Sequence, residues 1–374
     1  MINVNIKSNL IKIDFKLERR ISVIKGYSGA GKSLLCDILS STDYQQYVNT
    51  TPKNYNVIVV NSQTVSAVIR NETNAIIFAD DLTVVEGDSF AKLCSRYLVE
   101  NNLYIVLFTR AETKFDSENE ISFSMDCIYK MIDIDGIKKV LKPYYEFSDL
   151  RKAESLDCVI TEDKTAGNQF FSKLYNNKNV YSANSGKSTI IQDVLDRCFP
   201  NYSILMVVDR ASFGCHAEEL QFKIFNAGYS VFLLSGYECF EELLLNTNFF
   251  KEDDIIAEVL KNPSEFANSR LSWELYFEEL INRATKRKPY RHTHSTDQLF
   301  NCYWMSCDCE QSCVPQIKSK CLKKVKGDKF VWMLTNTKYA ILLNFYERDF
   351  GDSKSCNNDL KTSGKLRTIA AFRE

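Results

Sequence analysis

Eight consecutive residues near the N-terminus, GYSGAGKS from Gly26 to Ser33, match the phosphate-binding pattern G-x-x-x-x-G-K-[ST] in full. Glycines let such a loop wrap backbone N–H groups around the α- and β-phosphates of a nucleotide. The lysine of the pattern reaches the β- and γ-phosphates, and the serine hydroxyl ligates Mg²⁺. The pattern therefore predicts a nucleotide site formed by Gly26, Ser28, Gly29, Ala30, Gly31, Lys32, Ser33 and Leu34.

Acidic residues that could complete this site lie further along the chain. Residues 74–81 have the pattern of an apolar strand that ends in Asp80 and Asp81. An acid at the carboxyl end of a core strand can bind the Mg²⁺ of a nucleotide. We expect Ser33 and Asp80 to hold Mg²⁺ and Asp81 to orient or activate the attacking water, so that Lys32, Asp80 and Asp81 form the catalytic set. Alternatively, the two aspartates cap the next helix, where this residue type is common.

The pattern around the loop predicts a nucleotide-binding domain over residues 1–145. Residues 20–25 have the pattern of a strand that enters the loop, and residues 33–39 that of a helix whose N-terminus faces the anion. Two alternating runs ahead of them, at residues 4–6 and 10–15, indicate antiparallel strands that precede a parallel core. Further strands are expected at residues 55–62, 74–81 and 103–108, and a helix at residues 89–100.

Strand and helix patterns alternate over residues 156–235, which indicates a parallel α/β sheet with its site at the carboxyl ends of the strands. We assign a second α/β domain to residues 150–260. Two of its expected strands end in acids, Glu162 and Asp209. If these strands are neighbours, the two carboxylates could hold a divalent metal ion for phosphodiester chemistry.

The remaining residues, 261–374, predict a smaller α+β segment that is helical at its start, basic and rich in cysteine. An amphipathic helix is expected at residues 272–287, and the lysines and arginines after it could contact nucleic acid or form an ordinary solvated surface. Four closely spaced cysteines could supply the tetrahedral ligands of a zinc ion. They are Cys307, Cys309, Cys313 and Cys321. Because their spacing is not the paired C-x2-C form, free thiols in a loop are the alternative.

The composition is ordinary for a soluble globular protein, and the length predicts two or three domains. The chain has 374 residues, of which 45% are hydrophobic and 25% charged, and its net charge is −1. These values give no global bias toward nucleic acid or anionic membrane. The longest apolar runs are too short to span a bilayer, so we expect no membrane partner. The 13 cysteines, without a signal-peptide pattern at the N-terminus, predict reduced thiols in the cytoplasm.

The order of the N-terminal motifs resembles the P-loop NTPase superfamily, and the strands ahead of the loop are similar to those of ABC-type ATPases. This resemblance implies binding of ATP and Mg²⁺, and a homodimer is possible because many such ATPases act as dimers. The sequence has no LSGGQ-like signature, and Asp81 stands where ABC-type ATPases carry a catalytic glutamate. It also has no N-K-x-D-like motif that would read guanine. The resemblance therefore implies ATP binding with slow hydrolysis.

The middle of the chain resembles TOPRIM domains, on the basis of Glu162, a glycine-containing loop and the later sequence VVDRA. TOPRIM sites carry a second acid two residues from Asp209, where this chain has Val207 and Ala211. The order of a P-loop unit and a TOPRIM-like unit is similar to ATPase–nucleases of the overcoming-lysogenisation-defect type. It also resembles bacterial P-loop proteins whose function is not established.

Three functions follow from these patterns. The first is an ATP-binding protein with slow, Mg²⁺-dependent hydrolysis, whose nucleotide state acts on the TOPRIM-like domain or on a partner. The second is an ATP-gated, metal-dependent nuclease that uses Glu162 and Asp209. The third is a nucleotide switch that does not hydrolyse its ligand. A small-molecule kinase is a further alternative. Besides the nucleotide site, it would need a substrate-positioning base and an arginine-rich lid.

Overall fold

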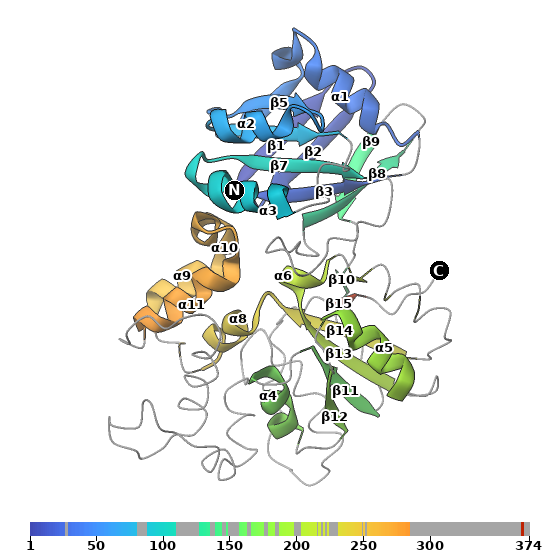
Figure 1. Ribbon diagram of the computed structural model, residues 1–374, viewed down its shortest axis with the longest axis vertical. Coiled ribbons are helices and arrows are strands. Elements are labelled where there is room, and N and C mark those ends of the chain that lie inside the picture. The colour runs from blue at the N-terminus through green and yellow to red at the C-terminus, as the bar shows by residue number, and fades with distance from the viewer. Residues whose placement is uncertain are drawn as a thin grey trace, which may run out of the picture. The chain divides into compact units, whose positions relative to one another are not determined.

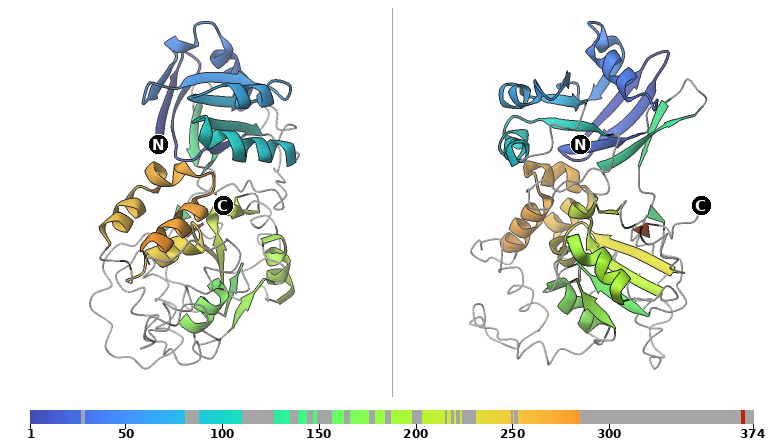
Figure 2. Two further views of the ribbon diagram at one scale, coloured as in Figure 1. Left: turned by 60° about the vertical axis from the view of Figure 1, so that its left-hand side comes forward. Right: turned by 45° about the vertical axis from the view of Figure 1, so that its right-hand side comes forward.

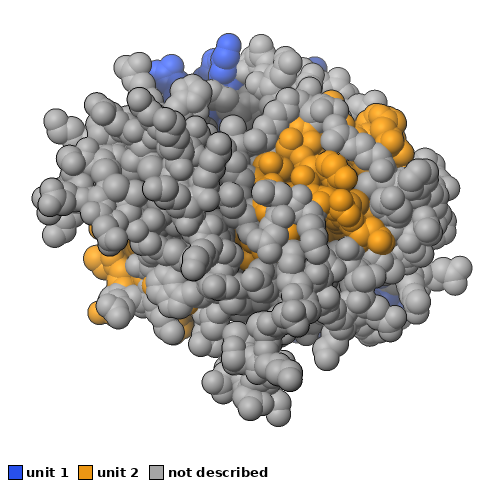
Figure 3. All heavy atoms as spheres, turned by 90° about the horizontal axis from the view of Figure 1, so that it is seen from below, with its two compact units in different colours: residues 1–146, 211–218, 262–273 blue, residues 147–210, 219–261, 274–374 orange. Residues whose placement is uncertain are grey.

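The chain folds into two compact units of mixed α/β structure, seen here in a computed structural model (Figure 1). Unit 1 comprises residues 1–146, 211–218 and 262–273, and unit 2 comprises residues 147–210, 219–261 and 274–374 (Figure 3). The structure describes residues 1–26, 29–80, 88–109, 127–134, 139–143, 147–148, 157–162, 166–175, 179–183, 187–197, 203–214, 216–217, 220, 223, 231–248, 250, 253–284 and 368–369.

Unit 1 is built on a six-stranded sheet with the order β5-β6-β7-β3-β8-β9. Its strands are β3 (Ile21–Lys25), β5 (Asn56–Val60), β6 (Ala75–Ala79), β7 (Tyr104–Thr109), β8 (Ile128–Asp133) and β9 (Lys139–Pro143). All neighbours are parallel except β9, which runs antiparallel to β8. The phosphate-loop strand β3 therefore lies inside the sheet, with its carboxyl end at the same edge as those of β6, β7 and β8.

A second, antiparallel sheet of unit 1 has the order β2-β1-β4. It consists of β1 (Ile2–Lys7), β2 (Lys12–Leu17) and β4 (Val48–Thr51). Burial alternates along β1 and β2, because every second side chain of a strand points to the same face. Those inward side chains join one core with residues of the six-stranded sheet, such as Ile24 and Phe108, and with α1 (Lys32–Ser40).

On the opposite face of the six-stranded sheet the central strands are also buried, as the side chains of Ile77 and Leu107 show. The helices α2 (Val65–Asn71) and α3 (Asp88–Glu100) lie side by side next to this sheet (Figure 2). Both contribute buried apolar side chains. Parallel strands need cover on both faces, and the helices supply it here.

A short segment far along the chain is anchored on the turn that leads into β3. It contains α10 (Pro263–Phe266) and the 3₁₀ turn η4 (Ala267–Ser269). The buried Asn268 donates to the Glu18 carbonyl at 2.6 Å and accepts from Trp273 Nε1 at 3.0 Å. Its own carbonyl accepts from Arg20 Nε at 3.2 Å. These bonds tie the segment of residues 262–273 to the turn before β3, which lies about 250 positions earlier in the sequence.

Unit 2 contains a six-stranded sheet with the order β10-β15-β14-β13-β11-β12. Its strands are β10 (Phe147–Ser148), β11 (Cys158–Thr161), β12 (Val180–Ser182), β13 (Ser203–Asp209), β14 (Val231–Tyr237) and β15 (Thr368–Ile369). The four strands β12, β11, β13 and β14 are parallel, and β15 pairs antiparallel with β10 and β14. The helices of this unit are α4 (Ala166–Leu174), α5 (Lys187–Arg197), α8 (Phe240–Leu245), α9 (Asp254–Lys261) and all of α11 (Trp273–Ala284) except its first residue, which belongs to unit 1. The short helix α6 (Arg210–Phe213) begins at the last residue of a unit 2 segment, and its other residues belong to unit 1.

The predicted mixed α/β class with parallel sheets is confirmed. The strand expected to end in Asp209 is β13, and the antiparallel strands expected ahead of the glycine-rich loop are β1 and β2. The hairpin of β8 and β9 and the strand β4 were missed, because their short apolar runs carry lysines, asparagines and threonines. The cysteines proposed for zinc and the basic stretches after residue 284 lie outside the described residues.

Candidate functional site

The loop of Gly26 to Ser33 follows β3 and leads into α1, as its sequence pattern predicts. Lys25 is the last residue of β3, Gly26 follows it, and Lys32 opens the helix. Gly29 and Gly31 have φ angles of +86° and +104°, which side-chain-bearing residues rarely adopt. Both glycines are therefore needed for the backbone to turn sharply before the helix.

The N-terminus of α1 is open to an anion. Gly31 occupies the N-cap position, and the helix has no side-chain cap hydrogen bond. The first N–H groups of a helix have no partner within the helix, and the helix dipole makes that end attractive to negative charge. Next to it, the Lys32 ammonium donates to the Gly26 carbonyl, which places this buried cation over the start of its own loop.

Asp80 directly follows β6 at the same edge of the sheet. Since β7 alone separates β6 from β3, the two strand ends lie about two strand spacings, or about 10 Å, apart. Burial, followed by the charges of Asp80 and Asp37, raises the pKa of the Cys36 thiol to about 12. Because the Asp80 charge acts on a residue of α1, this carboxylate lies near the helix that carries Lys32 and Ser33.

The remaining residues of the predicted nucleotide site fall into three groups. Ala30 and Leu34 are partly buried against the core of unit 1, so they fix the loop and helix rather than offer polar groups. Ser33 is exposed, which leaves its hydroxyl accessible to a metal ion. Ser28 and Asp81 lie outside the described residues.

The carboxylates proposed for the second site are brought together in unit 2. β11 and β13 are neighbouring parallel strands, with Thr161 opposite Val207. The buried Glu162 accepts a hydrogen bond at its Oε2 from the Asp209 backbone N–H at 2.9 Å. Both acids therefore stand at the ends of neighbouring parallel strands.

A third acid extends this row, and sequence reasoning missed it. β14 pairs with β13 in parallel, with Tyr237 opposite Asp209, and the buried Glu238 follows at once. The predicted alternation of strands and helices stops at residue 235, whereas β14 continues to Tyr237. The sequence did contain a signal for this acid, because Glu238 directly follows the residues of β14.

Further acids, from α8 and α11, act on Cys239, the residue that directly follows Glu238. Burial, then the charge of Glu274, raises the pKa of the Glu241 carboxyl to about 8, and Glu278 acts in the same direction. Burial and the charges of Glu241 and Glu274 also raise the pKa of the Cys239 thiol well above its ordinary value. At neutral pH this thiol is protonated and therefore a poor nucleophile.

Within the described parts of the chain, no group of three or more His, Cys, Asp or Glu side chains could hold a metal ion. The pair of Glu162 and Asp209 could still bind Mg²⁺ in the usual way, with one or two carboxylates and the rest of the shell from water and substrate phosphates. None of the helices that the structure describes is long and apolar enough to cross a membrane.

Comparison of the sequence with models of protein families gives no match, and comparison with curated proteins gives none either.

Proposed function

We propose that unit 1 binds ATP with Mg²⁺ at the loop of Gly26 to Ser33. The observation that carries this proposal is the left-handed Gly31 at the open N-terminus of α1, with the buried Lys32 beside it. A polyphosphate satisfies both features, since it accepts from the helix N–H groups and neutralises the ammonium. The preference for ATP over GTP is supported by the lack of a guanine-reading motif in the sequence.

Each residue of the site has a distinct role in this proposal. The loop N–H groups and Lys32 would orient the β- and γ-phosphates, and Ser33 and Asp80 would hold Mg²⁺. When bound, Mg²⁺ neutralises charge on the phosphate oxygens. Asp81, next to Asp80 in sequence, orients water for attack on the γ-phosphate. We expect slow hydrolysis, because this shorter side chain stands in place of the glutamate of ABC-type ATPases.

Phosphate release tests the enzymatic part of this proposal. The full-length chain is incubated with ATP and Mg²⁺, and phosphate is followed for the wild type, for Asp80→Asn and for Lys12→Ala. Lys12 is an exposed lysine on β2, so it controls for loss of a positive charge away from the loop. Release that persists in Lys12→Ala and disappears in Asp80→Asn supports the assignment. Equal release in both variants would refute the role of Asp80.

Unit 2 offers a second candidate function, a metal-dependent reaction on phosphodiesters at a TOPRIM-like site. It is favoured by one observation, the meeting of Glu162 and Asp209 at adjacent ends of the parallel strands β11 and β13. In this reading the nucleotide state of unit 1 gates cleavage of nucleic acid by unit 2. The basic stretches after residue 284 could bind that nucleic acid.

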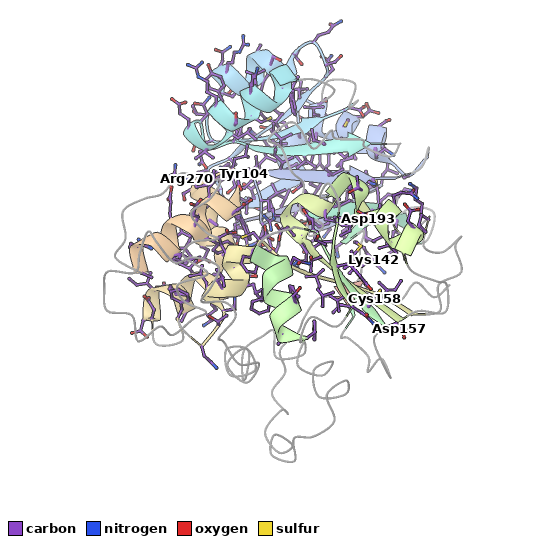
Figure 4. The ribbon with its side chains drawn as sticks, turned by 60° about the horizontal axis from the view of Figure 1, so that its bottom comes forward. Tyr104, Lys142, Asp157, Cys158, Asp193 and Arg270 are labelled. Atoms are coloured by element: carbon purple, nitrogen blue, oxygen red, sulfur yellow. The ribbon has the colours of Figure 1, made fainter. Side chains whose placement is uncertain are left out.

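Nicking of DNA or RNA in Mg²⁺ or Mn²⁺ tests this second function. Glu162→Gln removes the charge but keeps an oxygen that can accept from the Asp209 N–H, so the strand ends should stay in place. Asp157→Asn is the matched control, because Asp157 directly precedes β11 at its other end (Figure 4). Cleavage lost only in Glu162→Gln supports the site. Cleavage that survives in Glu162→Gln excludes it, and so does a wild type that cleaves no form of nucleic acid.

A further inference from the structure

The three-stranded sheet of unit 1 presents a basic outer face. Burial alternates along β1 and β2, so that apolar side chains point to the core and polar side chains point away from it. Lys7 of β1 and Lys12 and Lys16 of β2 lie on the outer side, and all three are exposed. With Asp14 as the single acid of the three strands on this side, the face has a formal charge of +2. We call this surface the lysine face.

The register of the sheet places the positive charges at its two ends. Lys7 stands directly opposite Lys12, whereas Lys16 stands opposite Asn3. Along β2, Lys12 and Lys16 are four residues apart, which corresponds to about 14 Å. Asp14 lies between them on the same strand, but it is not opposite a lysine. Because like charges that stand opposite each other on a sheet repel, an anion that contacts both Lys7 and Lys12 is stabilised there.

The other side chains of the lysine face are uncharged and can form hydrogen bonds. They come from β1 and β4 and are Asn3, Asn5, Asn49 and Thr51. Together with lysine, asparagine and threonine are side chain types that contact the phosphates of nucleic acids. None of the outward positions of these three strands, all of which the structure describes, carries an aliphatic or aromatic side chain.

This chemistry favours double-stranded nucleic acid over other anionic partners. Helices that bind membrane surfaces bury Trp, Phe or Leu at the bilayer boundary, and protein–protein interfaces are depleted of lysine and enriched in aromatic residues. Proteins that bind single strands stack the bases on aromatic side chains. A duplex instead offers two rows of phosphates, and its major groove is about 12 Å wide. That width is close to the separation of Lys12 and Lys16.

We propose that the lysine face binds the phosphate backbone of double-stranded nucleic acid without reading its sequence. Lys7 and Lys12 contact phosphates on one side of a groove, and Lys16 contacts a phosphate on the other side. This inference does not depend on the nucleotide site, because the three lysines project away from the core that contains residues of α1. It also assigns the contact to unit 1 and not to the basic stretches after residue 284.

Equilibrium binding of the full chain to a labelled DNA duplex, measured by fluorescence anisotropy at several salt concentrations, tests the inference. Lys7→Gln, Lys12→Gln and Lys16→Gln each remove one charge and keep much of the aliphatic stem. Lys92→Gln is the matched control, because Lys92 is an exposed lysine on α3 and not on the three-stranded sheet. Each change on the lysine face should weaken binding about three- to tenfold for any DNA sequence, and lower the slope of log K against log salt concentration by about 0.9. Lys92→Gln should change neither quantity, and ATP binding without DNA should be the same in all four variants.

Asp14→Asn gives a test in the opposite direction, which damage to the fold would not mimic. Removing this acid should tighten duplex binding about two- to threefold, because its charge lies about 7 Å along the strand from Lys12 and from Lys16. Unchanged affinity in the three lysine-face variants overturns the proposal, and so does an equal loss in Lys92→Gln, which would reflect only the total charge of the chain. A wild type that binds no duplex also overturns it. If that wild type binds phosphatidylserine vesicles through the same lysines, the face is a membrane-binding surface instead.

Discussion

Substituting Gly31 by alanine should destabilise unit 1 more than the same change at Gly29, two residues earlier. Both glycines have positive φ angles, +104° and +86°, and holding alanine there costs about 1–3 kcal/mol. Only at Gly31 would the new Cβ also meet Lys139, at 3.3 Å, whereas at Gly29 it would meet nothing within 4 Å. Crowding of this kind adds about 1–3 kcal/mol when the neighbour cannot move away.

The expected loss is therefore about 2–6 kcal/mol for Gly31→Ala and about 1–3 kcal/mol for Gly29→Ala. For a unit of this size, 1 kcal/mol corresponds to about 2–4 °C in the melting temperature. The Gly31→Ala transition should thus lie several degrees below that of Gly29→Ala. Calorimetry of the full chain measures the transitions, and hydrogen exchange in peptides from β3 and α1 identifies the one that belongs to unit 1.

A double-mutant cycle isolates the contact with Lys139. In a Lys139→Ala background the side chain that crowds residue 31 is gone, so the excess cost of Gly31→Ala should shrink, while the cost of Gly29→Ala should stay the same. Equal destabilisation by the two glycine substitutions in the wild-type background would refute the packing of Lys139 on the loop. So would an excess that is unchanged by Lys139→Ala.

Two further changes test other parts of the structure. Asn268→Ala should destabilise unit 1 by about 2–4 kcal/mol in denaturant unfolding, because it removes the bond to the Glu18 carbonyl and leaves the buried Trp273 N–H without its acceptor; an unchanged midpoint would contradict this anchoring. Glu241→Gln should stabilise unit 2 at pH 8–9 and have little effect near pH 4. The pKa of Glu241 rises from 4.5 to about 8 on folding, so the folded state holds the proton more tightly and wild-type stability falls as pH rises through this window. The gain above pH 8 should be about 3–5 kcal/mol, from about 1.4 kcal/mol per pH unit, and equal pH profiles for the two proteins would contradict the shift.

The local parts of the site could be predicted from the sequence because each depends on a short stretch of chain. The strand, loop and helix around Lys32 follow from glycine spacing and apolar periodicity within about twenty residues. The acids after β6 and β13 were found in the same way, since an apolar run that ends in Asp is a local signal.

The parts that escaped prediction depend on pairings between distant segments. Lys139 reaches the loop only because β8 lies beside β3 and β9 turns back along β8. Nothing in the sequence near Lys139 records that register. Asn268 bonds to Arg20 across 248 positions, and only tertiary packing brings them together. Glu238 was missed for a smaller reason, because Ser235 and Gly236 interrupt the apolar pattern of β14 before the acid.

Calorimetric titration of ATP with Mg²⁺ into the full chain measures whether the loop of Gly26 to Ser33 binds a nucleotide. We predict saturable binding of one nucleotide per chain, with affinity lost in Lys32→Ala and retained in Lys12→Ala. Binding of equal affinity in wild type and Lys32→Ala would contradict it, because the nucleotide would then bind without the residue on which the site depends.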